Sequence, residues 1–267
     1  MPSYQNSKST AVPPVKSSGE KLIELAQTLQ FSWFVGHSIV ILSSLFYGLS
    51  GREWLYRLTY LGVLESFGII TYQHFWLKPK SKDTELNMVN LLQNENVLYF
   101  TLSLLWFLTP SFTFTLLPYS IFALFHALNY LKNTLLPQVF NMTLENSKVV
   151  VFINKFINDY NERCMHWVGT SELSLLLILI LRILAWYPRS LIVIVLYSVF
   201  IKLRYENSKY MKTAFAQWRV RLDGVFAHPS IPPQVKLWYS KGKMALVNLS
   251  KYSLSKPIVV TDEQKKN

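Results

Sequence analysis

Four long apolar segments separated by polar stretches dominate the hydrophobic pattern of this chain. Residues 31–49 and 55–77 form a first pair joined by the short polar turn 50–53, and residues 97–131 and 173–203 form two longer runs. A single membrane-spanning helix needs about 20 apolar residues. The pattern therefore predicts an all-α integral membrane protein in which helical hairpins enter the bilayer and amphipathic helices lie on its surface.

The run 97–131 contains 35 residues and no Asp, Glu, Lys or Arg. It is too long for one spanning helix and slightly short for two full spans with a loop. Pro110 lies near its middle, and proline interrupts a helix because it lacks the amide donor and clashes with the preceding turn. We therefore predict two short helices that bend at Pro110 and enter and leave on the same side.

The run 173–203 repeats this pattern around Pro188, with about 14 apolar residues on each side. A helix of 14 residues rises only about 21 Å, which is less than the roughly 30 Å of a hydrocarbon core. Two interpretations remain open at this point. The halves form a shallow hairpin in one leaflet, or they form one long, kinked and tilted helix with Arg182 facing other protein.

The polar stretches predict the remaining organisation. Residues 1–19 and 257–267 are expected to be disordered cytosolic tails, and residues 20–203 form the multi-spanning membrane domain. Residues 204–256 form basic cytosolic amphipathic helices. A further amphipathic helix is expected over residues 144–163, on the membrane or against the bundle. Its expected apolar face consists of Val149, Phe152, Ile153, Phe156 and Tyr160.

The charge distribution predicts the orientation in the membrane. The chain has a formal net charge of +12, and residues 202–267 contain thirteen Lys or Arg against four Asp or Glu. Because basic loops stay in the cytosol, we expect both termini to be cytosolic. The sequons at Asn141 and Asn248 are then expected to carry no glycan.

The last amphipathic pattern covers residues 233–252 and combines Trp and Leu with several lysines. Such a helix suits an anionic membrane surface, where each Lys contributes roughly 1 kcal/mol. Two alternatives are an ordinary surface helix packed on the protein and a basic signal read by a partner such as a nuclear import receptor. The residues expected to bind the membrane surface are Val235, Lys236, Trp238, Tyr239, Lys243, Leu246, Leu249 and Lys251.

The composition and motifs do not indicate an enzyme. Cys164 is the only cysteine, and the five histidines do not show the spacing of a shared metal site. The sequence shows no Gly-rich phosphate loop, serine nucleophile motif or pair of catalytic carboxylates. We therefore predict no catalytic residue, no metal and no cofactor, and no nucleic-acid binding.

Intramembrane polar residues are functional candidates because they are costly to bury in lipid. The candidates are Glu65, His126, Asn129, Tyr130 and Arg182. The spacing of His126, Asn129 and Tyr130 puts them on one helical face, where a structural hydrogen-bond cluster between helices is the alternative to a functional role. Glu65 is expected to pair with an arginine such as Arg57 or Arg182, in a structural role or in transport.

Two stretches resemble a known family. Residues 117–132 (LPYSIFALFHALNYLK) resemble the signature of the transmembrane protein 33 family, also called the Krüppel-homologue-2 family. Residues 200–205 (FIKLRY), followed by Thr213-Ala-Phe215 and Arg219, resemble its second block. The resemblance covers about residues 20–250. Residues 206–210 (ENSKY) depart from the Asn-Pro-Tyr stretch of animal members, so the chain is more similar to the fungal branch.

The resemblance implies a tetra-spanning protein of the endoplasmic reticulum and nuclear envelope. The resemblance also implies reticulon-type shaping proteins, nucleoporins and a karyopherin as partners, whereas curved anionic lipids are expected from the basic amphipathic helix. The leading hypothesis is a non-enzymatic protein that organises membrane shape and the distribution or assembly of nuclear pore complexes. The alternatives are a transporter or channel subunit and a membrane-anchored scaffold that recruits a soluble partner.

Overall fold

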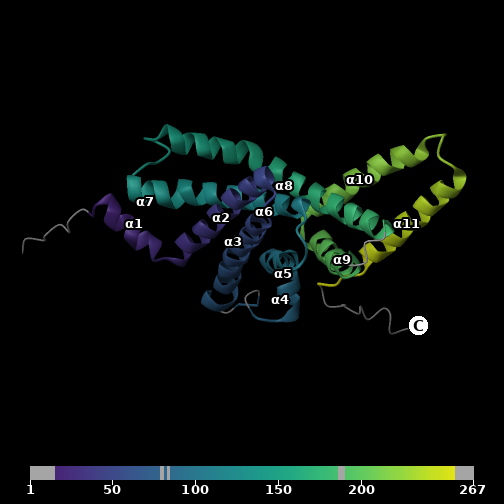
Figure 1. The fold of residues 1–267 in the computed structure, drawn as a ribbon, viewed down its shortest axis with the longest axis horizontal. Coiled ribbons are helices and arrows are strands. Elements are labelled where there is room, and N and C mark those ends of the chain that lie inside the picture. The colour runs from purple at the N-terminus through teal and green to yellow at the C-terminus, as the bar shows by residue number, and fades with distance from the viewer. Residues whose placement is uncertain (1–15, 79–80, 83–84, 186–189, 256–267) are drawn as a thin grey trace, which may run out of the picture.

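The computed structural model describes residues 16–78, 81–82, 85–185 and 190–255, and every regular element within them is a helix. The protein is therefore an all-α membrane protein, as predicted. In chain order (Figure 1) the elements are α1 (Ser18–Ala26), α2 (Leu29–Ser50), α3 (Glu53–Tyr72), η1 (Gln73–Leu77), α4 (Met88–Gln93), α5 (Glu95–Leu108), η2 (Thr113–Thr115), α6 (Leu116–Tyr130), η3 (Leu131–Leu135), α7 (Leu136–Phe140), α8 (Lys148–Leu184), α9 (Ser190–Asn207), α10 (Lys209–Ala227) and α11 (Pro233–Lys251).

The first two apolar segments form the predicted hairpin, α2 and α3. Gly51 ends α2 with a positive φ of 66°, a conformation that glycine adopts without steric cost, and so permits the tight turn. Further along, Gly36 and Gly62 let the two backbones approach closely, because a Cβ atom at Gly62 would lie 2.8 Å from the Gly36 carbonyl oxygen. Small residues at such crossings are typical of helix pairs in membranes.

The run 97–131 is broken at its proline, as predicted. Helix α5 ends at Leu108, Pro110 lies in the connection, and α6 begins at Leu116. The hydroxyl of Tyr119 donates to the carbonyl of Tyr99 (3.2 Å), so the chain turns back on itself. With 14 residues, α5 rises about 21 Å. The second half differs from the prediction, because the helical path continues through η3 and α7 to Phe140.

The prediction of a separate helix over residues 144–163 is wrong. Helix α8 begins at Lys148 and continues without interruption to Leu184, so the amphipathic stretch and the following apolar stretch form one element of 37 residues. The expected apolar face is also partly wrong. Ile153 and Ile157 pack against Phe125 of α6, whereas Phe152 and Tyr160 are 69% and 46% exposed.

The run 173–203 turns back on itself. Glu172 stands just before this run and Arg204 just after it, and the two side chains form an ion pair with 3.5 Å between Nε of Arg204 and Oε2 of Glu172. Of the two interpretations left open by the sequence, the structure supports the hairpin. The bend expected at Pro188 and the tails expected at residues 1–15 and 256–267 lie outside the described residues.

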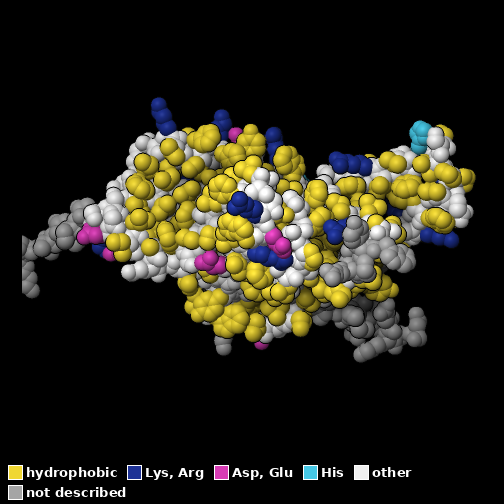
Figure 2. Space-filling view, in the orientation of Figure 1, with side chains coloured by type: hydrophobic (Ala, Val, Ile, Leu, Met, Phe, Trp, Pro, Cys, Tyr) yellow, Lys and Arg dark blue, Asp and Glu magenta, His cyan; other side chains and the backbone are white. Residues whose placement is uncertain are grey.

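The core of the bundle is unusually rich in tyrosine. Tyr56, Tyr60, Tyr119 and Tyr197 are at most 2% exposed. The hydroxyls of Tyr56 and Tyr60 lie 3.0 and 2.7 Å from the Thr115 hydroxyl, so the phenols are hydrogen-bonded while their rings fill the core. Outside this core, hydrophobic side chains cover much of the bundle face (Figure 2).

Three of the described helical stretches are long and apolar enough to cross a membrane: Leu29–Ser50, Thr113–Phe140 and Lys148–Leu184. Helix α5 is apolar but shorter. The length and composition of these helices agree with membrane insertion, which the exposed apolar surface also requires.

Candidate functional site

Helices α10 and α11 form an arm that leaves the bundle at one end (Figure 1, right). The start of the arm packs tightly against the bundle, since Met211 and Ala214 of α10 are at most 2% exposed. Beside them, a Cβ atom at Gly169 of α8 would lie 3.0 Å from the Tyr210 carbonyl oxygen. Beyond this crossing the contacts decrease, and α11 has no buried residue along its described length.

The first anchor of α11 is the carboxylate of Asp223 on α10. It accepts hydrogen bonds from the Tyr239 hydroxyl (2.6 Å) and from Nζ of Lys243 (2.7 Å). The Tyr239 ring stacks on Phe226 of α10 with 4.2 Å between centroids. These contacts couple the first half of α11 to the last turns of α10.

The titration behaviour of this anchor follows from its geometry. Hydrogen bonds from Lys243 and Tyr239 hold the pKa of Asp223 below its ordinary value. Partial burial, together with the hydrogen bond to the Asp223 carboxylate, raises the pKa of Tyr239 to about 12. At neutral pH Asp223 is therefore a carboxylate and Tyr239 a neutral phenol.

The second anchor holds the chain directly after α11. The Glu206 carboxylate, at the end of α9, accepts hydrogen bonds from the backbone amides of Leu254 (2.9 Å) and Ser255 (3.0 Å). It also accepts the hydroxyls of Ser253 (2.9 Å) and Ser255 (2.7 Å). Sequence reasoning missed this anchor, because Glu206 and Ser255 are 49 residues apart and neither stands in a recognisable motif.

Away from its anchors, α11 exposes much of its predicted apolar row. Trp238, Leu246 and Leu249 are 64%, 59% and 53% exposed. The predicted residues Val235 and Lys236 are half-buried near the start of the helix, and Lys251 is exposed at its end. Tyr239 and Lys243 face Asp223 of α10, so these two of the eight predicted surface residues serve the anchor in this structure.

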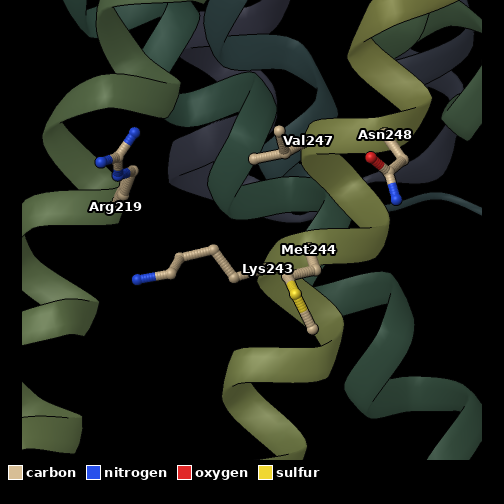
Figure 3. Close-up of a pocket in the computed structure, with 5 residues that line it drawn as sticks. All are labelled: Arg219, Lys243, Met244, Val247 and Asn248. Atoms are coloured by element: carbon tan, nitrogen blue, oxygen red, sulfur yellow. The ribbon is translucent and has the colours of Figure 1, made fainter.

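An open pocket of about 220 Å³ lies between the two helices of the arm (Figure 3). Lys243 reaches from α11 toward α10, where Arg219 is placed (Figure 3). Arg219 and Lys243 share the Asp223 carboxylate, at 3.7 and 2.7 Å. The other residues that line the pocket are Met244, Val247 and Asn248.

The predicted intramembrane polar residues do not gather into one site. His126 stacks on His37 (4.9 Å) and lies against Trp33 (5.2 Å). Tyr130 stacks on Phe34 at 4.8 Å, and the amide of Asn129 donates within its own helix to the Phe125 carbonyl (2.9 Å). The space beside His126 measures about 10 Å³, near the minimum for one water molecule.

The prediction that Glu65 pairs with Arg57 is wrong. Glu65 accepts a hydrogen bond from the Ser32 hydroxyl (2.7 Å). Arg57 instead bonds Glu53, one turn earlier on the same helix (2.8 Å), and the carbonyls of Phe107 and Thr109. The guanidinium of Arg182 lies over the Phe112 ring at 5.0 Å.

The buried charge of the bundle lies elsewhere, at Glu172 and Arg204, which are 1% and 2% exposed. The hydroxyl of Tyr99 donates to the Glu172 carboxylate, and Arg204 makes a second ion pair with Glu95 (2.6 Å). A signal for this network was present in the sequence. A single acidic residue directly precedes the run 173–203 and a single arginine directly follows it, as expected if a hairpin joins its two ends.

Comparison of the sequence with known proteins agrees with the family resemblance of residues 117–132 and 200–205. The sequence model of the family described as "Transmembrane protein 33/Nucleoporin POM33" matches residues 15–251. The chain is 48% identical over 260 residues to the "Pore membrane protein of 33 kDa" of Saccharomyces cerevisiae, covering 93% of both chains.

Two more distant relatives extend this comparison. The chain is 27% identical to "Nucleoporin POM33" of Chaetomium thermophilum, over 91% of this chain and 96% of that protein. It is 29% identical to the "Pore and endoplasmic reticulum protein of 33 kDa" of Saccharomyces cerevisiae, over 78% and 86%. No solved structure matches the chain significantly.

Proposed function

Because this chain belongs to the transmembrane protein 33/nucleoporin POM33 family, we propose that it organises membrane at the endoplasmic reticulum and nuclear envelope. The relatives named for the pore membrane and the reticulum support this location, including the membrane of the nuclear pore. In this proposal the protein acts without catalysis and influences the distribution or assembly of pore complexes.

The observation that carries the proposal is the unpartnered apolar row of α11. Its helix exposes Trp238, Leu246 and Leu249 by more than half, although a water-soluble surface has no use for them. The same helix carries Lys236, Lys241 and Lys251. A bilayer with anionic headgroups satisfies both requirements, because the apolar side chains enter the acyl boundary while the lysines meet the headgroups.

The two helical hairpins support the same function. Helix α5, with 14 residues, is shorter than the hydrocarbon core, and in this proposal both hairpins enter from the cytosolic side. With cytosolic termini, they add more volume to the cytosolic leaflet than to the lumenal one. Such an asymmetry favours positive curvature, which occurs at tubules and at the pore membrane.

The decisive experiment is live imaging of the full-length tagged protein together with a pore marker. The triple change Trp238→Ser, Leu246→Ser and Leu249→Ser is expected to leave the protein in the reticulum while reducing its enrichment at pores and clustering the pore marker. The matched control is Trp238→Phe, Leu246→Met and Leu249→Met, which keeps the row apolar and should behave as wild type. Equal pore distribution in both variants would reject a role for α11 on membranes.

The proposed topology has its own test at the two sequons. Asn141 ends α7 and Asn248 lies on α11, and both are cytosolic in this proposal. Treatment with an endoglycosidase is expected to leave the mobility of the protein unchanged. A shift that disappears when either asparagine is changed to Gln would show a lumenal location.

Recruitment of a soluble partner such as a karyopherin is a second candidate function, favoured by the basic surface of α10 and α11. The two functions separate in a pull-down by the full-length protein in detergent. Changing Lys236 and Lys251 to Gln should abolish capture of a karyopherin if recruitment is the main role. The apolar triple change should then leave that capture intact.

A further inference from the structure

The four residues that follow α11, Tyr252–Ser255, form a segment that we name the C-terminal clasp. The Glu206 carboxylate receives two backbone amides and two serine hydroxyls of the clasp, at distances from 2.7 to 3.1 Å. Lys202 forms an ion pair with Glu206 (2.8 Å) and donates to the Tyr252 carbonyl. The clasp is therefore built around one negative charge.

The clasp also reaches a third element. The side-chain amide of Gln93, at the end of α4, donates to the Ser255 carbonyl (2.8 Å), and Ser255 is only 1% exposed. The end of α11 is thus fixed to both α9 and α4. Because α11 has no buried residue of its own, the clasp and the Asp223 anchor together determine where the helix lies.

Changes in pH within the physiological range do not open the clasp. Burial alone would raise the pKa of Glu206, but the hydrogen bonds from Lys202, Leu254 and Ser255 outweigh it and lower the pKa to about 2. The carboxylate therefore stays charged in any cellular compartment. What the clasp does not tolerate is a second negative charge beside this carboxylate.

We propose that Ser253 is a phosphorylation site and that its phosphate opens the clasp. Ser253 is exposed, whereas Ser255 is buried, so a protein kinase reaches the Ser253 hydroxyl first. In the closed clasp that hydroxyl donates a hydrogen bond to Oε2 of Glu206, with 2.9 Å between the two oxygens. Its exposed position between Lys251 and the end of the clasp leaves the side chain accessible from solvent.

The chemistry is an ordinary phosphoryl transfer from ATP. The Ser253 oxygen forms a bond to the γ-phosphorus, the bond from that phosphorus to the β-phosphate oxygen breaks, and ADP leaves. The hydroxyl proton passes to the catalytic base of the kinase. The product carries about 1.5 to 2 negative charges and has no hydroxyl proton to donate, so an attraction to Glu206 becomes a repulsion.

Opening the clasp frees the end of α11, which then pivots about the Asp223 anchor and residues 228–232. The opening itself does not depend on the proposed role at membranes. If α11 binds lipid, the phosphate controls how far the helix reaches along the surface; if it binds a protein partner, the phosphate controls access to the helix.

The test uses the full-length protein in detergent micelles with phosphoserine incorporated genetically at position 253. Amide hydrogen exchange at Leu254 and Ser255 is expected to accelerate about tenfold or more, since both amides lose their acceptor. Ser253→Ala removes the hydroxyl that bonds Glu206 without adding charge and should change the exchange by less than about threefold. Phosphoserine at Ser250, whose hydroxyl bonds Val247 within α11, adds the same charge away from Glu206 and should also leave the clasp closed.

Two outcomes would overturn the proposal. Unchanged exchange at Leu254 and Ser255 with phosphoserine at position 253 would show that the clasp tolerates the charge. Absence of phosphate at Ser253 in protein purified from its own cells with phosphatase inhibitors, under growth and in mitosis, would show that it is not an acceptor. A loss of pore enrichment in the apolar triple variant bears on the membrane role alone, so the two ideas fail separately.

Discussion

The bundle and the α10–α11 arm both depend on carboxylates, but they place them in different surroundings. Glu172 lies in the bundle at 1% exposure, held by Arg204 and Tyr99. Asp223 holds α11 with a side chain that is 36% exposed, and Glu206 holds only the segment after α11; no described residue of α11 is buried. A buried ion pair inside the bundle joins elements that have to stay together, whereas an exposed anchor and a clasp at one end hold a helix that can be released.

The strongest test of this contrast is the removal of Glu172. Glu172→Ala leaves the Arg204 guanidinium buried with only part of its compensation, which is expected to lower the free energy of unfolding by about 3–5 kcal/mol. Thermal unfolding in micelles followed by circular dichroism measures the loss. The control is Glu162→Ala, which breaks an ion pair to Lys209 with both side chains about 70% exposed and should have little effect. Equal losses in the two variants would contradict the contrast.

A second test concerns packing in the bundle. Gly36→Leu is expected to lower the free energy of unfolding by about 1–3 kcal/mol, because the new side chain has to enter the α2–α3 crossing. The first added carbon alone would lie 2.4 Å from the Ser66 hydroxyl oxygen. Gly48→Leu is the matched control on the same helix, since nothing lies within 4 Å of its Cβ position. Similar melting temperatures for both variants would show that the close crossing is not required.

A third test examines the anchor in the arm without disturbing the bundle. Asp223→Asn removes the charge that Tyr239 and Lys243 share, so the arm should loosen while the melting temperature stays close to wild type. The pKa of Tyr239 should fall from about 12 toward its ordinary value of 10.0, but only in part, because burial also raises it. Titration of the ¹³Cζ-labelled tyrosines by NMR follows this change. A pKa that stays at about 12 would contradict the hydrogen bond to Tyr239.

The smallest effect is expected from mild acid. The folded-state pKa of Glu206 is about 2, below its ordinary value of 4.5, so its stabilisation is fully present above that ordinary value and is lost as the pH falls toward 2. Protection of the Leu254 and Ser255 amides, corrected for intrinsic exchange, should therefore be equal at pH 7 and pH 5.5. It should fall between pH 4 and pH 2. Loss of protection above pH 5 would assign the clasp to another group.

The membrane class and the helical breaks could be predicted from the sequence because they depend on local composition. The uncharged run 97–131 requires lipid, Pro110 lies in the break between α5 and α6, and the pattern of residues 233–252 places the end of α11 within one residue of its observed position. The family expected from residues 117–132 and 200–205 is confirmed by the match over residues 15–251.

The misses share a different physical origin, which is contact between distant residues. The change from an amphipathic to an apolar pattern predicts a boundary after residue 163, but no proline stands between residues 148 and 184, so one helix continues through both parts. Charge alone suggests Arg57 or Arg182 as the partner of Glu65, whereas Arg57 bonds Glu53 and two carbonyl groups. The Glu172–Arg204 pair and the clasp join residues 32 and 49 positions apart, beyond the reach of helical periodicity.

The continuity of α8 has a mechanical consequence. A helix of 37 residues is a rod of about 55 Å, and its apolar half and its polar half cannot rotate independently. A tilt of roughly 10° in one half therefore displaces the far end of the other by several ångströms. A change in bilayer thickness that tilts the apolar half is therefore expected to move the polar half, together with the packed α10.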